Sequence, residues 1–371
     1  MPRMSAAAQR VLLPLRGVKS TPETPYKKAR RPVPRPCRRS DFDVTDTVQV
    51  SRPASVREAV LELYADTWPG APREPLERAL RDFESLFTGQ MPGFLGVDTV
   101  YHDLQHSQDV VLAMARLLAG YERSPDGPRL GAERGLVALI TALFHDAGYI
   151  RETGEAAISN GAVFTRNHVT RSARFIARYL PAAGLANWVP ISTRIVHFTG
   201  YEVPLELLRV ADARDRLAGH LLGTADMLAQ MADRCYLEKC RDRLYAEFVL
   251  GDIAVHAGSE GVKVLYGSGL DLLRQTPKFI ASTIDNRLGT AFGHSYRYVE
   301  PLYGGDNPYM NAIRQNVEYL KGLTRGSRWP MLRRNPPVFT VESNAMDGVR
   351  TLLVRHLKQV FGAPASVLSA T

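Results

Sequence analysis

The 371-residue chain has little cysteine and no long apolar run. Its three cysteines, Cys37, Cys235 and Cys240, form no CxxC pair and no even set, which argues against a disulfide framework and against thiolate metal ligation. No stretch approaches the roughly 18 to 20 apolar residues of a membrane-spanning helix. Phosphate-loop patterns of the types GxxxxGK and GxGxxG are also missing. We therefore expect a cytoplasmic protein with no membrane partner.

The net positive charge of the chain comes from its first 40 residues. They carry eleven Lys or Arg against one acid, Glu23, a net charge of +10, which leaves the rest of the chain at −1 of the overall +9. Phosphate contacts need clustered basic residues on the folded surface, so a near-neutral body argues against a broad nucleic-acid-binding face. Only the basic arm is left as a candidate for recruiting nucleic acid or acidic partners.

Residues 1–50 are also rich in proline and lack apolar periodicity, so we expect a disordered arm. The opening segment contains Arg, Ser and Ala and no acid before Glu23. This composition fits an organelle transit peptide, and equally a leader without defined structure or an over-long start. A secretory signal is disfavoured because Pro14 and Arg16 interrupt its short apolar stretch.

From residue 52 onward the sequence is typical of helices. Ser55 followed by Glu58 is a capping-box pattern, and apolar residues then recur at helical spacing, whereas alternating strand patterns are nearly absent. The pattern predicts an all-α domain over residues 52–325 and a C-terminal extension over 326–371. The expected helices are Ser55–Trp68, Pro75–Phe87, Leu104–Gly120, Gly135–Asp146, Arg166–Leu180, Ile191–Phe198, Ala218–Ala232, Tyr236–Val249, Tyr309–Leu320 and Asp347–Phe361.

The segment Gly135–Tyr149, GLVALITALFHDAGY, places a His–Asp pair directly after an apolar run. The run predicts a buried helix, which carries His145 and Asp146 into the interior. Burying an unpaired carboxylate costs several kcal/mol, so Asp146 needs a cation, a set of hydrogen bonds or a metal ion.

Further histidines and acids turn this pair into a candidate metal site. In YHDLQHSQDV, His102 and His106 are four residues apart and project from one helix face. A single histidine there is more often a hydrogen-bonded core residue, but two at this spacing followed by His–Asp favour a site. A helical bundle can bring such groups to one point. The remaining candidates are His168 in NHVTRS, His197 in RIVHFTG and Asp226 in GTADM.

Imidazole and carboxylate side chains suit zinc, manganese, iron or nickel, with magnesium as a harder alternative. A carboxylate can bridge two ions about 3.5–4 Å apart, and such ions lower the pKa of bound water toward about 7. We therefore expect one or two divalent metal ions as the cofactor.

The order H…HD…D resembles the HD-domain superfamily of metal-dependent phosphohydrolases. More narrowly, YHDLQHSQDV resembles the YHxxxHAxDV signature of the class I cyclic-nucleotide phosphodiesterases. The segments HDAGY, NHVTRS, GTADMLAQMADRCYLEKCRDRLYAEF and NPYMNAIRQN are similar to prokaryotic HD-domain proteins described as predicted phosphohydrolases, and they span about residues 95–322. The resemblance implies an HD-domain or phosphodiesterase-like helical bundle.

The resemblance also implies roles for single residues. His102 matches the proton donor, and Asp146 matches the carboxylate that bridges two ions and so takes part in catalysis. It favours Asp226 as a ligand over Asp212 and Asp215, which can equally be exposed helix charges. The implied metal ligands are His106, His145, Asp146 and Asp226, with His168 toward the second ion and His197 as the last candidate.

The implied function is hydrolysis of a phosphodiester such as a 3',5'-cyclic nucleotide by metal-activated water. Two alternatives stay open: an HD-type nucleotidase or nucleoside triphosphate hydrolase, and a non-catalytic metal-binding sensor or scaffold. Asp103 stands where the signature has Asn, and the glutamine and phenylalanine that hold the purine in animal phosphodiesterases are not located in the sequence. The expected partner is thus a small phosphorylated molecule, most simply a nucleotide, and the sequence indicates no oligomeric state.

Several neighbouring residues have two interpretations. Gln230, one turn after Asp226, is either a hydrogen-bond donor to Asp226 or a polar surface residue. Arg171 either meets a substrate phosphate or pairs with a nearby acid. We expect one apolar stripe to be core, namely Tyr236, Leu237, Cys240, Leu244 and Phe248.

Overall fold

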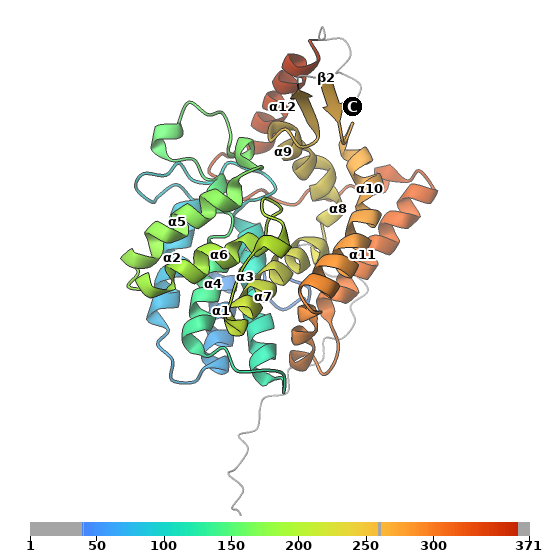
Figure 1. Cartoon of the computed structure of the whole chain (residues 1–371). Helices are drawn as coiled ribbons and strands as arrows, with labels where there is room; N and C mark the ends of the chain where they lie inside the picture. Colours follow the sequence, from blue (N-terminus) through green and yellow to red (C-terminus); the bar gives the residue numbers. More distant parts are fainter. Residues whose placement is uncertain (1–38, 40, 259–260, 363–371) are drawn as a thin grey trace, which may run out of the picture. The chain divides into compact units, whose positions relative to one another are not determined.

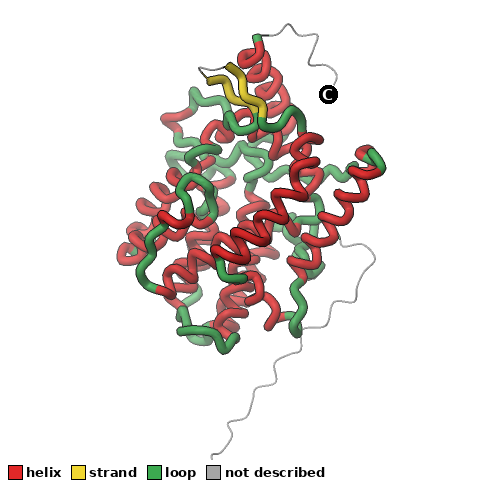
Figure 2. Tube along the Cα trace, turned by 45° about the vertical axis from the view of Figure 1, so that its right-hand side comes forward, coloured by secondary structure: helices red, strands yellow, loops and turns green. Residues whose placement is uncertain are grey.

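The computed structural model describes residues 39, 41–258 and 261–362, so most of the arm expected over residues 1–50, namely residues 1–38 and 40, lies outside the described residues. The described chain is mainly helical, with one two-stranded antiparallel hairpin, so the predicted all-α class is confirmed (Figures 1 and 2). Among the described helices, none has both the length and the apolar character needed to traverse a bilayer. The α-helices of four residues or more are α1 Pro53–Thr67, α2 Glu74–Phe87, α3 Leu104–Arg123, α4 Ala132–Leu143, α5 His168–Ala182, α6 Val189–Ile195, α7 Ala213–Ala232, α8 Tyr236–Lys239, α9 Tyr245–Leu250, α10 Gly269–Ser282, α11 Pro308–Arg325 and α12 Ala345–Phe361.

Helix α3 is the central element of the fold and is buried along nearly its whole length. Helices α1, α4 and α7 pack against it, together with the 3-10 segment Ser295–Leu302. The approach of that segment is close, because a Cβ at Gly120 would lie 1.4 Å from the carbonyl oxygen of Tyr298. Only glycine fits at this crossing.

Helix α4 carries the His–Asp pair, but it ends earlier than predicted. Its last residue is Leu143, and His145 and Asp146 lie in the turn that leads into the 3-10 segment Ala147–Tyr149. This turn lies against the start of α5, where a Cβ at Gly148 would be 1.8 Å from the carbonyl oxygen of His168. Gly148 therefore allows the His–Asp turn and the first residue of α5 to meet.

The predicted helix Tyr236–Val249 is interrupted by a π-helical turn. Helix α8 leads into this turn at Cys240–Leu244, and α9 follows it. The hairpin of β1 (Val255–Gly258) and β2 (Gly261–Val264) comes next, paired in the register Val255 to Val264. Helix α10 after it was not predicted, because Gly269 and Pro277 weaken its helical signal.

The packed body extends beyond both boundaries of the predicted domain, residues 52 and 325. Residues 41–50 already contact the body, with Val50 in the main core and Asp43 paired to Arg116 of α3. At the other end α12 packs on α9, where Ala345 and Val349 share a small core with residues of α9. The expected helix in the C-terminal extension is confirmed, and the described part of the extension, residues 326–362, belongs to the same packed unit.

Candidate metal centre

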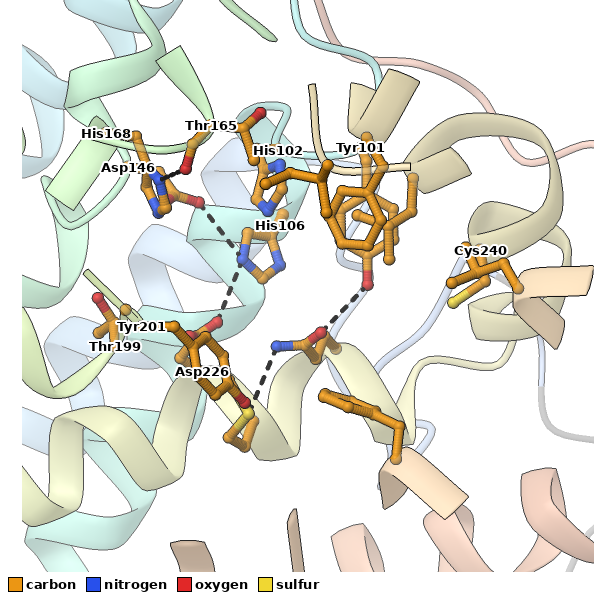
Figure 3. A pocket seen from close by; sticks show the side chains of 18 of the residues that line it. Tyr101, His102, His106, Asp146, Thr165, His168, Thr199, Tyr201, Asp226 and Cys240 are labelled. Atoms are coloured by element: carbon orange, nitrogen blue, oxygen red, sulfur yellow. Dashed lines mark hydrogen bonds and ion pairs between the residues drawn. The ribbon is translucent and has the colours of Figure 1, made fainter. Parts of the chain in front are cut away.

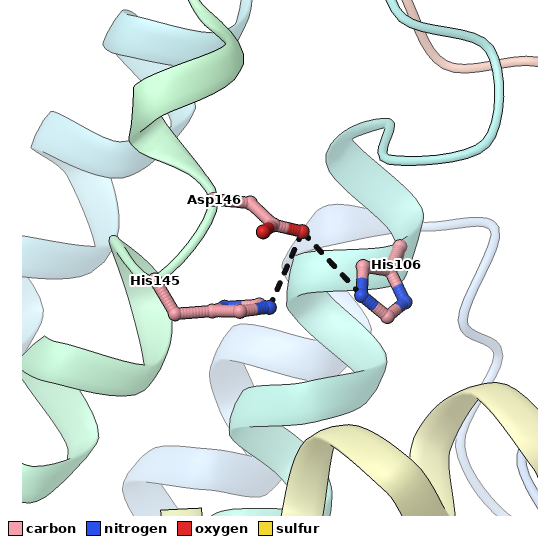
Figure 4. Close-up of side chains that lie close together, drawn as sticks. All are labelled: His106, His145 and Asp146. Carbon is pink, nitrogen blue, oxygen red and sulfur yellow. Dashed lines mark ion pairs between the residues drawn. The ribbon is translucent and has the colours of Figure 1, made fainter. Parts of the chain in front are cut away.

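Three side chains from two elements meet in the buried interior. The carboxylate Oδ2 of Asp146 lies 3.5 Å from Nε2 of His106 and 3.2 Å from Nε2 of His145 (Figure 4). One potential ligand atom from each residue falls within 4.8 Å of the others. Helix α3 supplies His106, and the turn after α4 supplies the other two. The group therefore has the donor types and spacing of a metal site.

Helices α7 and α5 complete the cluster. Oδ1 of Asp226, on α7, lies 3.4 Å from Nε2 of His106 and 4.0 Å from Nε2 of His145. His168 opens α5, and its Nε2 lies 3.8 Å from Oδ1 of Asp146. The two oxygens of Asp146 thus face different histidines, Oδ2 toward His106 and His145, and Oδ1 toward His168. This is the arrangement a bridging carboxylate needs.

The hydrogen bonds of the cluster leave two potential metal ligand atoms, one on His145 and one on Asp146, without a hydrogen-bond partner. Nδ1 of His145 donates to the carbonyl of Ala142 at 2.8 Å, and Nδ1 of His168 donates to the carbonyl of Thr165 at 2.8 Å. In the neutral rings these bonds place the lone pair on Nε2, which faces Asp146. Nε2 of His145 and Oδ2 of Asp146 are buried and have no hydrogen-bond partner. With a neutral His145 ring both atoms lack a donor, which is costly, and a bound cation would satisfy both.

The electrostatics of the cluster favour a cation. Burial alone would lower the pKa of His145, but the neighbouring Asp146 carboxylate raises it to about 9. Burial alone would raise the pKa of Asp146, yet His145, His102 and His106 hold it well below its usual range. In the described residues, the ion pairs of Asp146 and Asp226 involve histidines alone, without Lys or Arg. The field that holds a proton on His145 would equally attract a metal ion.

His102 lies beside the cluster and is held by a buried acid that the sequence did not reveal. Its Nδ1 lies 2.6 Å from Oε2 of Glu247, a fully buried residue of α9. The other oxygen, Oε1, accepts from the backbone N–H of Tyr101 at 2.5 Å. Burial opposes the charged ring, but Glu247 outweighs it and raises the pKa of His102. The imidazole is therefore oriented and kept ready to carry a proton.

An aromatic stack fixes the same ring from its face. The ring of Tyr149 stacks on His102 with centroids 4.5 Å apart, and on His168 at the same distance. Tyr149 belongs to the HDAGY segment, so its position next to the His–Asp pair was visible, but its contact with His102 was not. The stack links the proton-carrying ring to the metal-binding side of the site.

The cluster forms one end of a cavity of about 660 Å³ (Figure 3). His102, His106, Asp146, His168 and Asp226 line this end, and Cys240 lies at the other side in the view. The apolar stripe expected in the core is buried there, and most of it also faces the cavity. The stripe residues that line it are Tyr236, Cys240, Leu244 and Phe248. Helical spacing predicted a buried face here, but not that a cavity lies against it.

The structure decides between the two interpretations of Arg171 and gives Gln230 a position that neither of its interpretations described. Gln230 lines the cavity and accepts from the hydroxyl of Tyr101 at 3.4 Å, while its amide nitrogen contacts the sulfur of Met227. Arg171 pairs with Glu155 through two bonds of 2.8 Å and donates to the carbonyl of Gly148. Arg171 therefore stabilises the turn that carries His145 and Asp146.

His197 is not brought to the cluster. It lies in the 3-10 segment Val196–Phe198 after α6, and it is not among the described residues that line the cavity. Burial lowers its pKa, and its Nδ1 has no hydrogen-bond partner. The prediction of His197 as a metal ligand is not supported by this position, since a lone histidine at helical spacing gives no direction.

Asp103 anchors the start of α3 rather than bonding His102. Its Oδ1 accepts from the backbone N–H of His106 at 3.1 Å and caps the helix. Its Oδ2 accepts from the N–H of Phe339 at 3.1 Å, in the extended segment before α12. The C-terminal extension is thereby tied to the turn between His102 and His106.

Comparison of the chain with protein-family models, with curated proteins and with solved structures finds no match. The functional argument therefore rests on the geometry of the cluster and of its cavity.

Proposed function

We propose that this chain is a metal-dependent phosphohydrolase of the HD-domain type that acts on a small phosphodiester, with a 3',5'-cyclic nucleotide as the first substrate class to test. The carrying observation is the buried group of His106, His145, Asp146 and Asp226, with unpaired atoms at the end of a cavity. The position of His102 beside this group supports a hydrolytic role.

The metal ions would be held by His106, His145, Asp146 and Asp226, with His168 next to the second oxygen of Asp146. When bound, divalent ions lower the pKa of water and offset the negative charge that develops on a phosphoryl group. Zinc, manganese, iron and nickel suit the imidazole and carboxylate ligands.

The residues of the chain supply the proton transfer. Hydrolysis forms a bond between a water oxygen and phosphorus and breaks the bond to the leaving oxygen, which needs a proton. His102 lines the cavity, and Glu247 accepts from its Nδ1, so Nε2 is the atom that can deliver the proton. General acid catalysis of this kind contributes about 10²–10⁴-fold.

The test is hydrolysis of bis(p-nitrophenyl) phosphate by the full chain, after removal of metal and addition of manganese, nickel or zinc. We expect turnover that depends on the added ion and that is lost in His102→Ala. A panel of cyclic nucleotides and nucleoside mono- and triphosphates then separates diesterase from nucleotidase activity. Stoichiometric metal with no turnover on any of these substrates would overturn the enzymatic proposal in favour of a sensor.

A further inference from the structure

The cavity has a second half whose character differs from that of the metal cluster. Its walls come from the π-helical turn, α9, the end of the hairpin and α10. The side chains there are mostly aliphatic or aromatic, among them Leu244, Phe248, Ile253, Leu265, Leu272 and Phe279. A surface of this kind gains free energy by covering an apolar group and loses it by burying a charge.

The charges that line the cavity do not provide for a second phosphate. Of the described lining residues, Arg166 is the one Lys or Arg, and its guanidinium donates to the carbonyl of Asp252. Glu202 adds an acid, and its oxygens accept from the first backbone N–H groups of α5. A polyphosphate chain would therefore meet one cation beyond the candidate metal cluster, Arg166, whose guanidinium is already bonded to a carbonyl.

The apolar half continues to the protein surface. Tyr201, Leu265 and Phe279 line the cavity, and each of these large side chains is also exposed to solvent. Tyr201 is 65% exposed and Leu265 is 54% exposed. Exposed apolar side chains that continue into an apolar cavity are typical of a ligand-binding region. A long group could thus run from the metal cluster to the rim.

We infer that this half of the cavity is a subsite for the organic group of the substrate, which makes the preferred substrate a single-phosphate ester with a large, uncharged alkyl or aryl group. The inference rests on the proposed function for its phosphate end. The phosphate lies at the histidines and carboxylates, and the apolar group lies along α9 and α10 toward Leu265 and Phe279.

The first experiment measures kcat/KM for a series of alkyl p-nitrophenyl phosphates, from methyl to octyl, below their micelle concentrations. In each reaction water supplies the oxygen that binds phosphorus, and p-nitrophenol leaves. A fully buried methylene raises kcat/KM by about fourfold, so we expect a rise of two- to fourfold per methylene along the series. ATP should be a poor substrate under the same conditions.

Two leucines of similar exposure provide matched variants. Leu265 lines the cavity and Leu207 does not, and their exposed fractions are 54% and 59%. Leu265→Gln should flatten the dependence on chain length, while Leu207→Gln should keep the wild-type slope. An equal slope in wild type and Leu265→Gln, or faster hydrolysis of ATP than of the octyl ester, would overturn the inference.

The second experiment is independent of activity and metal. The neutral fluorescent probe N-phenyl-1-naphthylamine is titrated into metal-free wild type, Leu265→Gln and Leu207→Gln. We expect saturable binding that Leu265→Gln weakens severalfold and Leu207→Gln does not. Probe binding without any hydrolysis would support the subsite and refute the proposed function. Hydrolysis without probe binding or chain-length dependence would refute the subsite alone.

Discussion

Two groups of buried charged side chains can be compared within this fold. In the first, Arg116 on α3 bonds Asp43 at 2.6 Å and the hydroxyl of Tyr309 at 2.8 Å. Both carboxylate oxygens of Asp43 also accept hydrogen bonds from residues 45–48. In the second, the candidate metal cluster, the ion pairs of Asp146 are to histidines, and its Oδ2 has no hydrogen-bond partner among the described residues.

The two groups are similarly buried, so burial alone does not mark a functional site. The Arg116 group pairs opposite charges and saturates Asp43, which is how a structural ion pair becomes tolerable in the interior. The candidate metal cluster pairs carboxylates with histidines instead of Lys or Arg, leaves two buried atoms without a hydrogen bond and lines a cavity. The difference teaches that unpaired atoms facing a cavity indicate a ligand site, and it predicts opposite responses to mutation.

The largest effect is expected for Asp146→Ala. Because Asp146 lies between three histidines, its loss should weaken metal binding by at least about 100-fold and abolish hydrolysis. The free energy of unfolding of the metal-free protein should fall as well, because Asp146 raises the pKa of His145 and the two groups stabilise each other in the folded state. Elemental analysis and urea unfolding measure the two quantities. Full metal content in this variant would contradict the assigned site.

The next effect is expected for His102→Ala. Removing the proton donor should lower kcat by about 10²–10⁴-fold while metal content stays at the wild-type level. Parallel measurement of bound metal and of the rate on bis(p-nitrophenyl) phosphate distinguishes this result from the loss of a ligand. Wild-type turnover would remove His102 from the mechanism.

The opposite behaviour is expected for Asp43→Asn. Leaving Arg116 without its carboxylate should cost about 3–5 kcal/mol of unfolding free energy, with metal content unchanged. Burial alone would raise the pKa of Asp43, but Arg116 and hydrogen bonds hold it below its usual value. The wild-type advantage should therefore be complete above about pH 4 and shrink as the pH falls further. Urea unfolding at pH 7 and pH 3 measures it, and an advantage that grows at pH 3 would contradict this account.

A smaller effect is expected for Glu247→Gln, which keeps the shape of the side chain but removes its charge. Because the carboxylate raises the pKa of His102, its loss should lower that pKa. In the proposed mechanism protonated His102 donates the proton, so the alkaline decline in activity should move to lower pH, with kcat reduced about tenfold. The pH profile of kcat is the measurement. An unmoved alkaline limb would show that Glu247 does not act through His102.

The residues of the candidate metal cluster were easier to predict from the sequence than the residues that surround them. His106, His145 and Asp146 could be predicted as one group because each lies in a short motif on or next to a helix, and the family resemblance added Asp226 to them. Glu247 could not, since it lies 145 residues from His102 and looks like any acid on an amphipathic helix. Glu247 meets His102 because the fold places α9 beside the residues that precede α3.

The fold was predicted to a similar extent. The main helices follow from apolar periodicity, and their ends differ by a few residues where turns such as His145–Asp146 stop the helix. The packing of residues 41–50 was missed because they were grouped with the proline-rich, basic stretch before them, although they contain no proline themselves. The apolar stripe of α8 and α9 faces a cavity, because periodicity gives the buried face of a helix but not what lies against it.

The most direct test of the central claim is the metal content of the purified full chain. The protein is incubated with manganese, nickel or zinc, freed of unbound ion by gel filtration and measured by elemental analysis. The account predicts one or two ions per wild-type chain and the same content in Asp43→Asn. A wild-type chain that retains no ion under any of these conditions would contradict the assignment of the His106, His145, Asp146 and Asp226 cluster as a metal centre.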